Sequence, residues 1–283
     1  MQAEVAEVLD PKRDGVYVDA TIGPGGHTGY LLERIGSEGK IIGIDRDEEA
    51  LKVSEKRFTG KRVCLKRGKF SDMEGFIRSE GIAEVDGVLF DLGISMPQLK
   101  NQARGFSFLT DARLDMRMDR TQEVSAWDIV NTYPEKQIEK ILGEYGEERL
   151  AKKIAKAIAQ ARHRTQIDSC AQLAEIVRAV YRKRGRIHPA TRTFQALRVA
   201  VNRELDQLTE GLSAACGLLR KGGKLCVISY HSLEDRIVKH YIAGNAREKI
   251  LMNITKKPRT PSAREIRMNP SARSAKLRAA EKI

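Results

Sequence analysis

Three aspartates near the start of the chain each end a short apolar run, a position from which a carboxylate can bind a ligand. Asp19 ends "VYVD", Asp45 ends "KIIGID" and Asp91 ends "VDGVLFD". If these runs are parallel strands, their carboxyl ends share one edge of a sheet, where open α/β folds bind ligands. There Asp19 suits an ammonium group, and Asp45 can accept both hydroxyls of an unphosphorylated ribose. The alternative is that each aspartate only caps the helix that follows it.

A glycine-rich turn, "TIGPGGHTGY", follows the first of these runs. Gly23, Gly25 and Gly26 let the backbone turn tightly and approach a ligand closely. A dinucleotide-binding turn would read G-x-G-x-x-G, but the third glycine position is Thr28, which argues against a pyrophosphate. A ligand with a cationic amino acid and a ribose but no phosphate is S-adenosylmethionine (SAM). The turn and the three carboxylates together predict SAM as the cofactor.

The elements that must position these residues alternate along the first part of the chain. Runs rich in Val, Ile and Leu predict strands at 15–20, 40–45, 62–67 and 85–93, and amphipathic stretches predict helices at 28–36, 47–57 and 72–80. Such alternation is typical of an α/β fold with a parallel, doubly wound sheet.

The pattern changes after this first part. From about 105 to 195 the sequence indicates helices only, as in "EERLAKKIAKAIAQAR", where apolar residues recur three and four apart. The alternation resumes with a long helix from about 194 to 220 and a strand–helix unit in "KLCVISYHSLEDRIVKHYI". We therefore expect a discontinuous domain, 1–104 and 196–283, with an all-helical domain inserted at 105–195. The tail from 245 is poor in large apolar residues and is expected to wrap around the body or to be partly disordered.

The net charge of +13 is concentrated in two regions. Residues 151–195 carry +9 and residues 245–283 carry +8, which leaves −4 for the rest of the chain. A nearly neutral body with two basic regions favours a polyanionic partner, because phosphate neutralisation supplies most of the non-specific affinity for nucleic acids. The alternative interpretation is an ordinary solvated surface.

The remaining composition argues against several classes of protein. The four cysteines are scattered without a CxxC pair, which disfavours structural zinc and disulfides and favours the reducing cytoplasm. No apolar run approaches the roughly 18–20 residues of a membrane span, and the first residues do not resemble a signal peptide. No ligand spacing indicates a metal site. We expect a cytoplasmic protein with no membrane partner, as a monomer or a homodimer.

Several longer strings carry a resemblance to a known family. These are "DATIGPGGHT", "FDLGISMPQL", "LDMRMD", "EYGEERLAKKIAKAI", "HPATRTFQALRVAVNREL", "SYHSLEDRIVK" and "NPSARSAKLRAAE". Over residues 14–283 the chain resembles the bacterial ribosomal RNA small-subunit methyltransferase H family, also called MraW. The resemblance implies a class I SAM-dependent methyltransferase fold with a helical insert. It also implies methylation of the exocyclic N4 of a cytidine in 16S rRNA, near the ribosomal P site.

The resemblance also assigns cofactor contacts by motif. It implies that SAM is bound by Gly25, Gly26, His27, Asp45, Phe70, Asp91 and Gln98, with Asp45 on the ribose and Phe70 near the adenine. Two departures stand out. Family members usually carry an H-x-P-V segment before the first helix, and this sequence starts at "MQAEVAEVL". An Asn/Asp-Pro-Pro-aromatic motif, found in many amino-methyltransferases, is replaced by "DLGI", so the N4 assignment depends on the resemblance alone.

The chemistry calls for a group that accepts a proton from the cytidine amino nitrogen as the methyl group is transferred. Asp91, at a strand end beside the cofactor, is the first candidate for this acceptor. His231 in "SYHSLED" is the second, although a single histidine at such a position is more often structural. Asp115 and Asp119 in "LDMRMD" could contact the substrate, but the neighbouring arginines make a structural ion-pair network an equal alternative.

The loop "RKRGRIHPATR" at 182–192 is the expected RNA-binding segment. Its cations would position the RNA through phosphates rather than read bases, and they are Arg182, Lys183, Arg184, Arg186 and Arg192. The target cytidine has to be exposed or flipped, and Phe106 and Phe108 are the nearest candidates to stack on a base. Two other functions stay open: a SAM-binding, RNA-associated ribosome assembly factor, and a SAM-dependent methyltransferase of DNA.

Overall fold

The computed structural model describes residues 1–181 and 188–283, apart from the side chain of Lys100. These residues form two compact units, the first made of Met1–Gly93 and Leu205–Ile283 and the second of Ile94–Glu204. The junctions lie at 93/94 and 204/205, whereas the sequence indicated 104/105 and 195/196. In the described part of the chain no helix is both long and apolar enough to cross a membrane.

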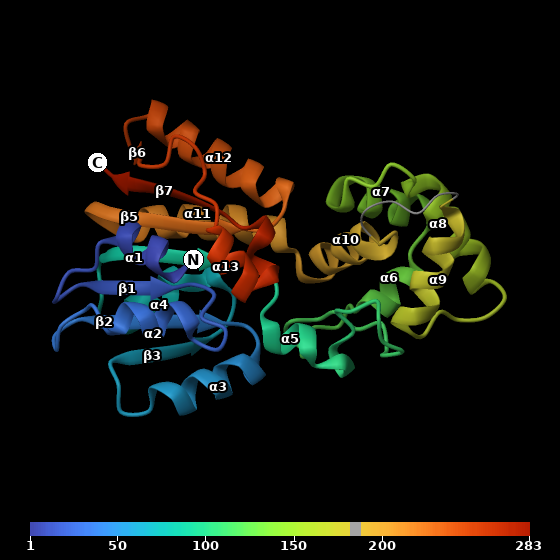
Figure 1. Cartoon of the computed structure of the whole chain (residues 1–283), viewed down its shortest axis with the longest axis horizontal. Helices are drawn as coiled ribbons and strands as arrows, with labels where there is room; N and C mark the ends of the chain where they lie inside the picture. Colours follow the sequence, from blue (N-terminus) through green and yellow to red (C-terminus); the bar gives the residue numbers. More distant parts are fainter. Residues whose placement is uncertain (182–187) are drawn as a thin grey trace. The chain divides into compact units, whose positions relative to one another are not determined.

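The first unit is built on a seven-stranded sheet with the order β3-β2-β1-β4-β5-β7-β6 (Figure 1). The five parallel strands are β1 (Val16–Asp19), β2 (Lys40–Asp45), β3 (Val63–Arg67), β4 (Val85–Asp91) and β5 (Leu219–Ser229). β7 (Lys276–Lys282) pairs antiparallel with β5, and β6 (Leu251–Asn253) pairs antiparallel with β7. The predicted doubly wound α/β fold is therefore confirmed, with an antiparallel extension at one side.

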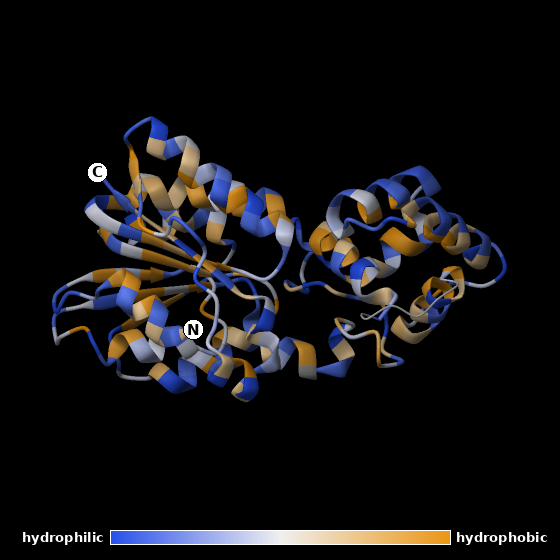
Figure 2. Cartoon of the chain, turned by 45° about the horizontal axis from the view of Figure 1, so that its top comes forward, coloured by the Kyte–Doolittle hydropathy of each residue, from blue (hydrophilic) through white to orange (hydrophobic). Residues whose placement is uncertain are grey.

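Helices cover both faces of this sheet, as the hydropathy colouring in Figure 2 makes visible. They are α1 (Gln2–Leu9), α2 (Gly26–Leu32), α3 (Glu48–Phe58), α4 (Met73–Ser79), α11 (Glu204–Leu218) and α12 (Ser232–Arg247), with short helices η1 (Phe70–Asp72), α13 (Ala263–Met268) and η3 (Pro270–Ser274). Alternate strand residues enter two separate apolar clusters, so that Tyr17 and Ile41 pack on one face and Val18 and Ile42 on the other. Burial on both faces explains why the strands are continuous apolar runs.

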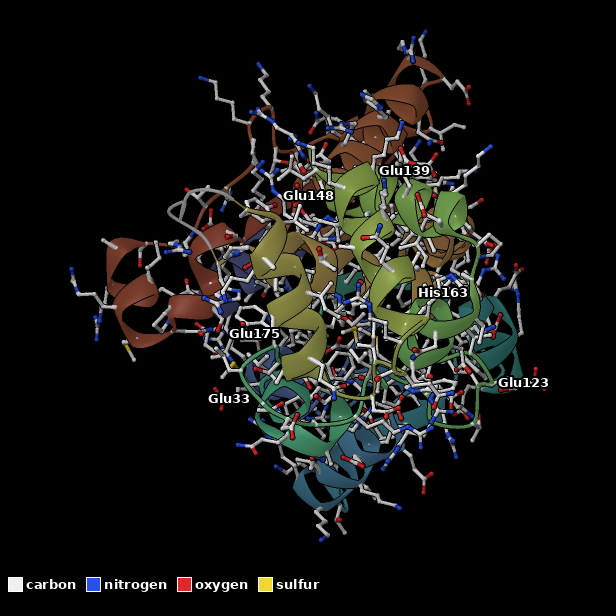
Figure 3. All side chains as sticks on the ribbon, turned by 90° about the vertical axis from the view of Figure 1, so that its right-hand side faces the viewer. Glu33, Glu123, Glu139, Glu148, His163 and Glu175 are labelled. Carbon is white, nitrogen blue, oxygen red and sulfur yellow. The ribbon has the colours of Figure 1, made fainter. Side chains whose placement is uncertain are left out.

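The second unit is helical, as predicted. It contains α5 (Met96–Lys100), η2 (Gln102–Arg104), α6 (Ala126–Thr132), α7 (Glu135–Gly146), α8 (Ala151–Arg162), α9 (Cys170–Val180) and α10 (Ala190–Asn202). The residues spaced three and four apart form its core, since Ile154, Ile158, Leu173 and Val177 are all completely buried. Glu148, between α7 and α8, accepts a hydrogen bond from the Tyr181 hydroxyl at 2.6 Å and ties α9 to them (Figure 3).

One expectation about the elements was wrong, and of the two alternatives for the tail only partial disorder was wrong. The long helix at 194–220 is split into α10 and α11 at Arg203, which adopts the left-handed conformation (φ 49°). The side chain of Asn202 then bonds the backbone of the 116–118 segment, donating to Met116 O and accepting from Met118 N, both at 2.8 Å. The tail is also ordered: it supplies β6 and β7, because the short run at Leu277–Ala280 is buried beside β5.

Candidate active site at the carboxyl edge of the sheet

The glycine turn between β1 and α2 is fixed by contacts with its neighbours. The Gly23 N–H donates to Asp45 Oδ2 at 2.9 Å, and the Ser54 hydroxyl donates to the Gly23 carbonyl at 2.7 Å. Gly25 is left-handed (φ 76°), and a Cβ placed there would lie 2.3 Å from a ring carbon of Phe58. Gly25 is therefore required both by its conformation and by the packing beneath it.

Asp19 is held inside the first unit by Thr28, which stands where a dinucleotide-binding turn would have its third glycine. Its side chain is almost fully buried, and the Thr28 hydroxyl donates to Oδ2 at 2.7 Å. Burial raises the pKa of Asp19, and the hydrogen bond from Thr28 counteracts part of that increase. The threonine that argued against a dinucleotide-binding turn thus has a definite structural role.

Asp45 ends β2, and its two carboxylate oxygens bind different backbone groups. Oδ2 accepts the Gly23 N–H, and Oδ1 accepts the Asp47 N–H at 2.9 Å. Burial raises the pKa of Asp45 to about 6, although both hydrogen bonds lower it. Each oxygen keeps a second lone pair, so the carboxylate can still accept ligand hydroxyls.

Asp91 ends β4 and lies between two side chains from other elements. Its Oδ1 accepts a hydrogen bond from the Tyr230 hydroxyl at 2.9 Å, and its Oδ2 lies 3.4 Å from His27 Nε2. Burial lowers the pKa of His27, but the hydrogen bond and the charge of Asp91 outweigh it and raise that pKa overall. Burial raises the pKa of Tyr230 as well, which keeps its phenol protonated as a donor. The carboxylate remains partly exposed, with 29% of its side chain accessible.

His231 follows β5, as the sequence indicated, and its side chain contacts the first turn of α12. It is the N-cap residue of α12 and forms a capping box with Glu234. Its Nε2 also lies 3.1 Å from Glu234 Oε1, and Glu234 is almost fully buried. These contacts match the structural alternative for His231, and it is the neighbouring Tyr230 that contacts Asp91.

Phe70 and Gln98, the two other expected cofactor contacts, lie in different units. Phe70 is the first residue of η1, and its ring packs edge-on against Phe90 with ring centroids 5.3 Å apart. The ring also lies so close to position 211 that only a glycine fits there. Gln98 belongs to the second unit, where it is buried and forms a capping box with Ser95 at the start of α5.

Of the five cations expected to bind RNA, the structure describes only Arg192. Arg182, Lys183, Arg184 and Arg186 lie outside the described residues. Arg192 donates to the Glu147 carbonyl at 3.0 Å.

The residues of "RGFSF" and "LDMRMD" that were expected to contact the substrate make contacts with other residues of the second unit. Phe106 is buried in its core, and Phe108 stacks on His188 with ring centroids 4.4 Å apart. The guanidinium of Arg117 donates two hydrogen bonds to Asp115, at 2.7 and 2.9 Å, as the ion-pair interpretation predicted.

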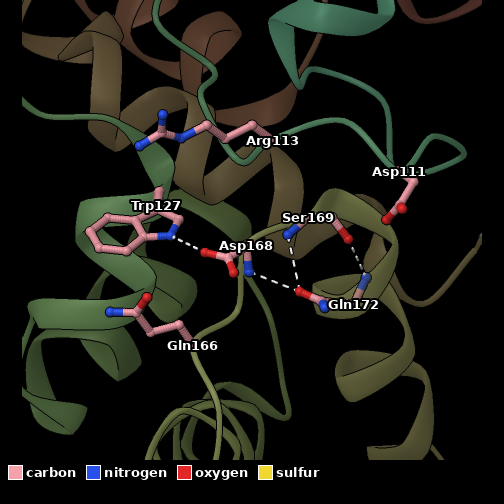
Figure 4. A pocket seen from close by; sticks show the side chains of 7 residues that line it. All are labelled: Asp111, Arg113, Trp127, Gln166, Asp168, Ser169 and Gln172. Atoms are coloured by element: carbon pink, nitrogen blue, oxygen red, sulfur yellow. Dashed lines mark hydrogen bonds between the residues drawn. The ribbon is translucent and has the colours of Figure 1, made fainter.

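The second unit also contains a hollow of about 600 Å³ that sequence reasoning missed (Figure 4). Its lining residues are Asp111, Arg113, Trp127, Gln166, Asp168, Ser169 and Gln172. The indole N–H of Trp127 donates to Asp168 Oδ1 at 2.8 Å, which fixes the ring at the wall. The guanidinium of Arg113 is exposed and makes no ion pair with any described residue. The single tryptophan of the chain was the signal that could have indicated this site.

Three residues of the carboxyl edge were also missed: Thr21, Thr28 and Tyr230. The Thr21 hydroxyl accepts the Asp91 N–H at 2.6 Å, so it links the ends of β1 and β4. Tyr230 directly follows β5, which pairs with β4, and this position at the end of a neighbouring strand was the available signal.

The whole chain, residues 1–283, matches the model of the MraW methylase family. A ribosomal RNA small subunit methyltransferase H of Persephonella marina is 50% identical over 272 residues, which cover 94% of this chain and 92% of the relative. The protein of the same name from Coprothermobacter proteolyticus is 48% identical over 283 residues, covering 100% and 94%. A solved structure of a putative rRNA methylase from Clostridium thermocellum is similar with a TM-score of 0.49 at 16% identity, covering 100% of this chain and 93% of that one. The chain therefore belongs to the MraW methylase family.

Proposed function

We propose that this protein transfers a methyl group from SAM to the exocyclic N4 of a cytidine in the 16S rRNA of the small ribosomal subunit, in the P-site region. The family is one of methylases, and the relatives are named as ribosomal RNA small subunit methyltransferases. The observation that carries the proposal is that Asp19, Asp45 and Asp91 surround the glycine turn at one edge of the sheet.

The residues at this edge fit SAM. His27 Nδ1 is buried without a hydrogen-bond partner among the described residues, as expected of an atom that meets a polar ligand. Gly25, Gly26 and His27 would hold the methionine part, with Asp19 near its ammonium group and Asp45 on the ribose hydroxyls. Gly23 would act through Asp45, and Phe70 would lie near the adenine. When bound, SAM supplies the methyl group as an electrophilic carbon.

Asp91 would accept a proton from the cytidine amino group. The lone pair of this nitrogen is delocalised into the ring, so an acceptor on its N–H helps to localise it for attack. Tyr230 and His27 hold the two carboxylate oxygens from different elements, which limits rotation of the side chain. Such fixed orientation is the main contribution that an enzyme makes to an in-line transfer.

The hollow of the second unit supports an RNA substrate. Unpaired bases in RNA are recognised by stacking on aromatic rings and guanidinium groups and by hydrogen bonds to their edges. Trp127 and Arg113 provide the first kind of surface, and the amide of Gln166 and the amide nitrogen of Gln172 provide the second. A duplex DNA substrate would not offer unpaired bases without further opening.

Methyl transfer from labelled SAM to three substrates tests the function. The substrates are small subunits that lack the modification, naked 16S rRNA and duplex DNA, and chromatography with mass spectrometry of the nucleosides identifies the product. We expect N4-methylcytidine from the ribosomal substrates and no transfer to DNA. Label at C5, or in DNA, would contradict the proposal. SAM binding without transfer to any substrate would favour the assembly factor.

A further inference from the structure

The segment that joins β6 to β7, residues 254–275, concentrates positive charge on the first unit; we call it the basic segment. It contains a single acidic residue, Glu265, and six basic residues: Lys256, Lys257, Arg259, Arg264, Arg267 and Arg273. Arg259 is paired with Glu7 at 2.9 Å. The other five cations are exposed, and in the part of the chain that the structure describes none of them makes an ion pair.

Several other cations of the same unit are paired with carboxylates. Lys40 and Lys66 share Glu80, each at 2.7 Å. Within β7 itself, Lys276 and Arg278 share Asp235, at 3.2 and 2.7 Å. The five unpaired cations of the basic segment therefore form a local excess of positive charge, and such a cluster attracts a polyanion.

The topology places the basic segment at the same edge as the carboxylates. Because β7 is antiparallel to β5, its first residue, Lys276, lies opposite Ser229, the last residue of β5. η3 ends two residues before Lys276, and α13 packs against η3. Tyr230, which holds Asp91, follows Ser229. The chain therefore enters β7 beside the residues proposed to do the chemistry.

Contacts with α1 give a second, independent indication of this location. Glu265 of α13 forms an ion pair with the amino group of Met1. The next residue, Gln2, donates from Nε2 to the carbonyl of Gly26 at 2.9 Å. Two consecutive residues thus connect α13 to the glycine turn, and Figure 1 shows α13 next to the start of the chain.

We propose that the basic segment binds the phosphates of the RNA strand that carries the target cytidine. Arg264 and Arg267 are one helical turn apart on α13, and Arg273 follows on η3, so all three serve one stretch of backbone. Met268, 78% exposed between them, offers an apolar contact to a sugar or a base. This inference depends on the proposed function for the identity of the strand, but the surface is distinct from the loop at 182–192.

The test compares two triple variants that lose the same charge at opposite ends of the sheet. The first is Arg264→Ala, Arg267→Ala and Arg273→Ala. The control is Arg13→Ala, Lys61→Ala and Lys221→Ala, three exposed cations that lie before or near the beginning of β1, β3 and β5. Binding of a fluorescent single-stranded RNA is measured across a salt series, with SAM affinity and thermal unfolding of each variant measured alongside.

Each phosphate contact to single-stranded RNA contributes about 0.7 to the slope of log affinity against log salt. We expect the first variant to lose about 2 in slope and to bind about tenfold more weakly near 0.15 M salt, with SAM affinity unchanged. The control should keep the wild-type slope. If the first variant unfolds, single substitutions should each lower the slope by about 0.7.

An unchanged slope in the first variant, or equal loss in both variants, would overturn the inference. It would also be overturned if vesicles containing phosphatidylserine bound through these arginines while RNA did not. A failure of the proposed function is distinguishable, because it would appear as RNA binding that depends on the basic segment without methyl transfer by the wild-type protein.

Discussion

The carboxyl edge of the first unit and the hollow of the second hold their polar groups in different ways. At the carboxyl edge, Asp19 and Asp45 are fixed by hydrogen bonds from Thr28, Gly23 and Asp47, and Asp19 is almost fully buried. In the hollow, Arg113 and Gln166 are exposed and come from loops. The first arrangement is preorganised for a small ligand of constant shape, whereas the second suits a larger ligand that is bound by adaptation. Changes at the edge should therefore affect SAM, and changes in the hollow should affect RNA.

The largest effect is expected from Gly25→Val. The new side chain would meet the ring of Phe58 and would require a left-handed conformation that β-branched residues avoid. We expect SAM affinity to fall at least about 100-fold and the free energy of unfolding to fall by about 2–4 kcal/mol. Calorimetric titration and chemical denaturation measure the two quantities. Gly75→Val is the matched control, because Gly75 lies in α4, away from the turn, and no atom lies within 4 Å of the Cβ that it would gain. Equal losses for both variants would contradict this account of the turn.

A pH dependence is expected next, from Asp45. Its pKa is raised to about 6 in the folded protein, so the carboxylate is ionised above that pH and protonated below it. The ionised form accepts the ribose hydroxyls, so SAM affinity should be constant above about pH 7 and should fall about tenfold for each unit below pH 6. Asp45→Asn should bind SAM weakly at all pH values and without this inflection. An inflection near pH 4 would show that the ligand meets Asp45 in an ordinary environment.

Trp127→Ala tests the role of the hollow in binding RNA. Stacking of a base on an aromatic ring contributes about 1–3 kcal/mol, so the KM for the RNA substrate should rise about tenfold or more. SAM affinity should not change, because Trp127 belongs to the second unit. Trp127→Tyr retains an aromatic face and should recover most of the loss. If Trp127→Ala weakened SAM binding instead, the division of roles between the two regions would be wrong.

The smallest effect is expected from Tyr230→Phe. It removes one hydrogen bond to Asp91 and leaves the ring packing in place. We expect kcat to fall about three- to tenfold. The KM for both substrates should stay within about twofold of the wild-type value, and the thermal unfolding temperature within a few degrees. Tyr230→Leu removes the ring packing as well as the hydrogen bond, and it should lower kcat and the thermal unfolding temperature together. An unchanged kcat in Tyr230→Phe with a lower unfolding temperature would identify Tyr230 as a purely structural residue.

The sequence was sufficient to predict the strand-end aspartates, because parallel strands place their carboxyl ends together whatever their side chains do. It was not sufficient for Tyr230, which meets Asp91 across 139 residues and only because β5 lies beside β4. The role of Thr28 depends on the direction of its hydroxyl within the turn, which spacing does not give. The hollow around Trp127 also depends on loops brought together by packing.

The errors in the fold have similar causes. The break at Arg203 is a left-handed residue whose sequence offers neither glycine nor proline as a signal. Apart from Leu277, β7 consists of small and charged residues, and it is stabilised by pairing with β5 on one side and β6 on the other rather than by its own apolar pattern. Local patterns predict elements that local interactions favour, and these two features depend on distant partners.

The most direct test of the central claim is single-turnover methyl transfer by Asp91→Asn to small subunits that lack the modification. The amide keeps the shape of the side chain but cannot accept the amino proton as a carboxylate does. We expect the rate to fall about 100- to 10,000-fold. SAM affinity should stay within about threefold of wild type, since the turn and Asp45 are intact. Equal loss of rate and SAM affinity would make Asp91 a cofactor contact, and an unchanged rate would remove the carboxyl edge from the chemistry.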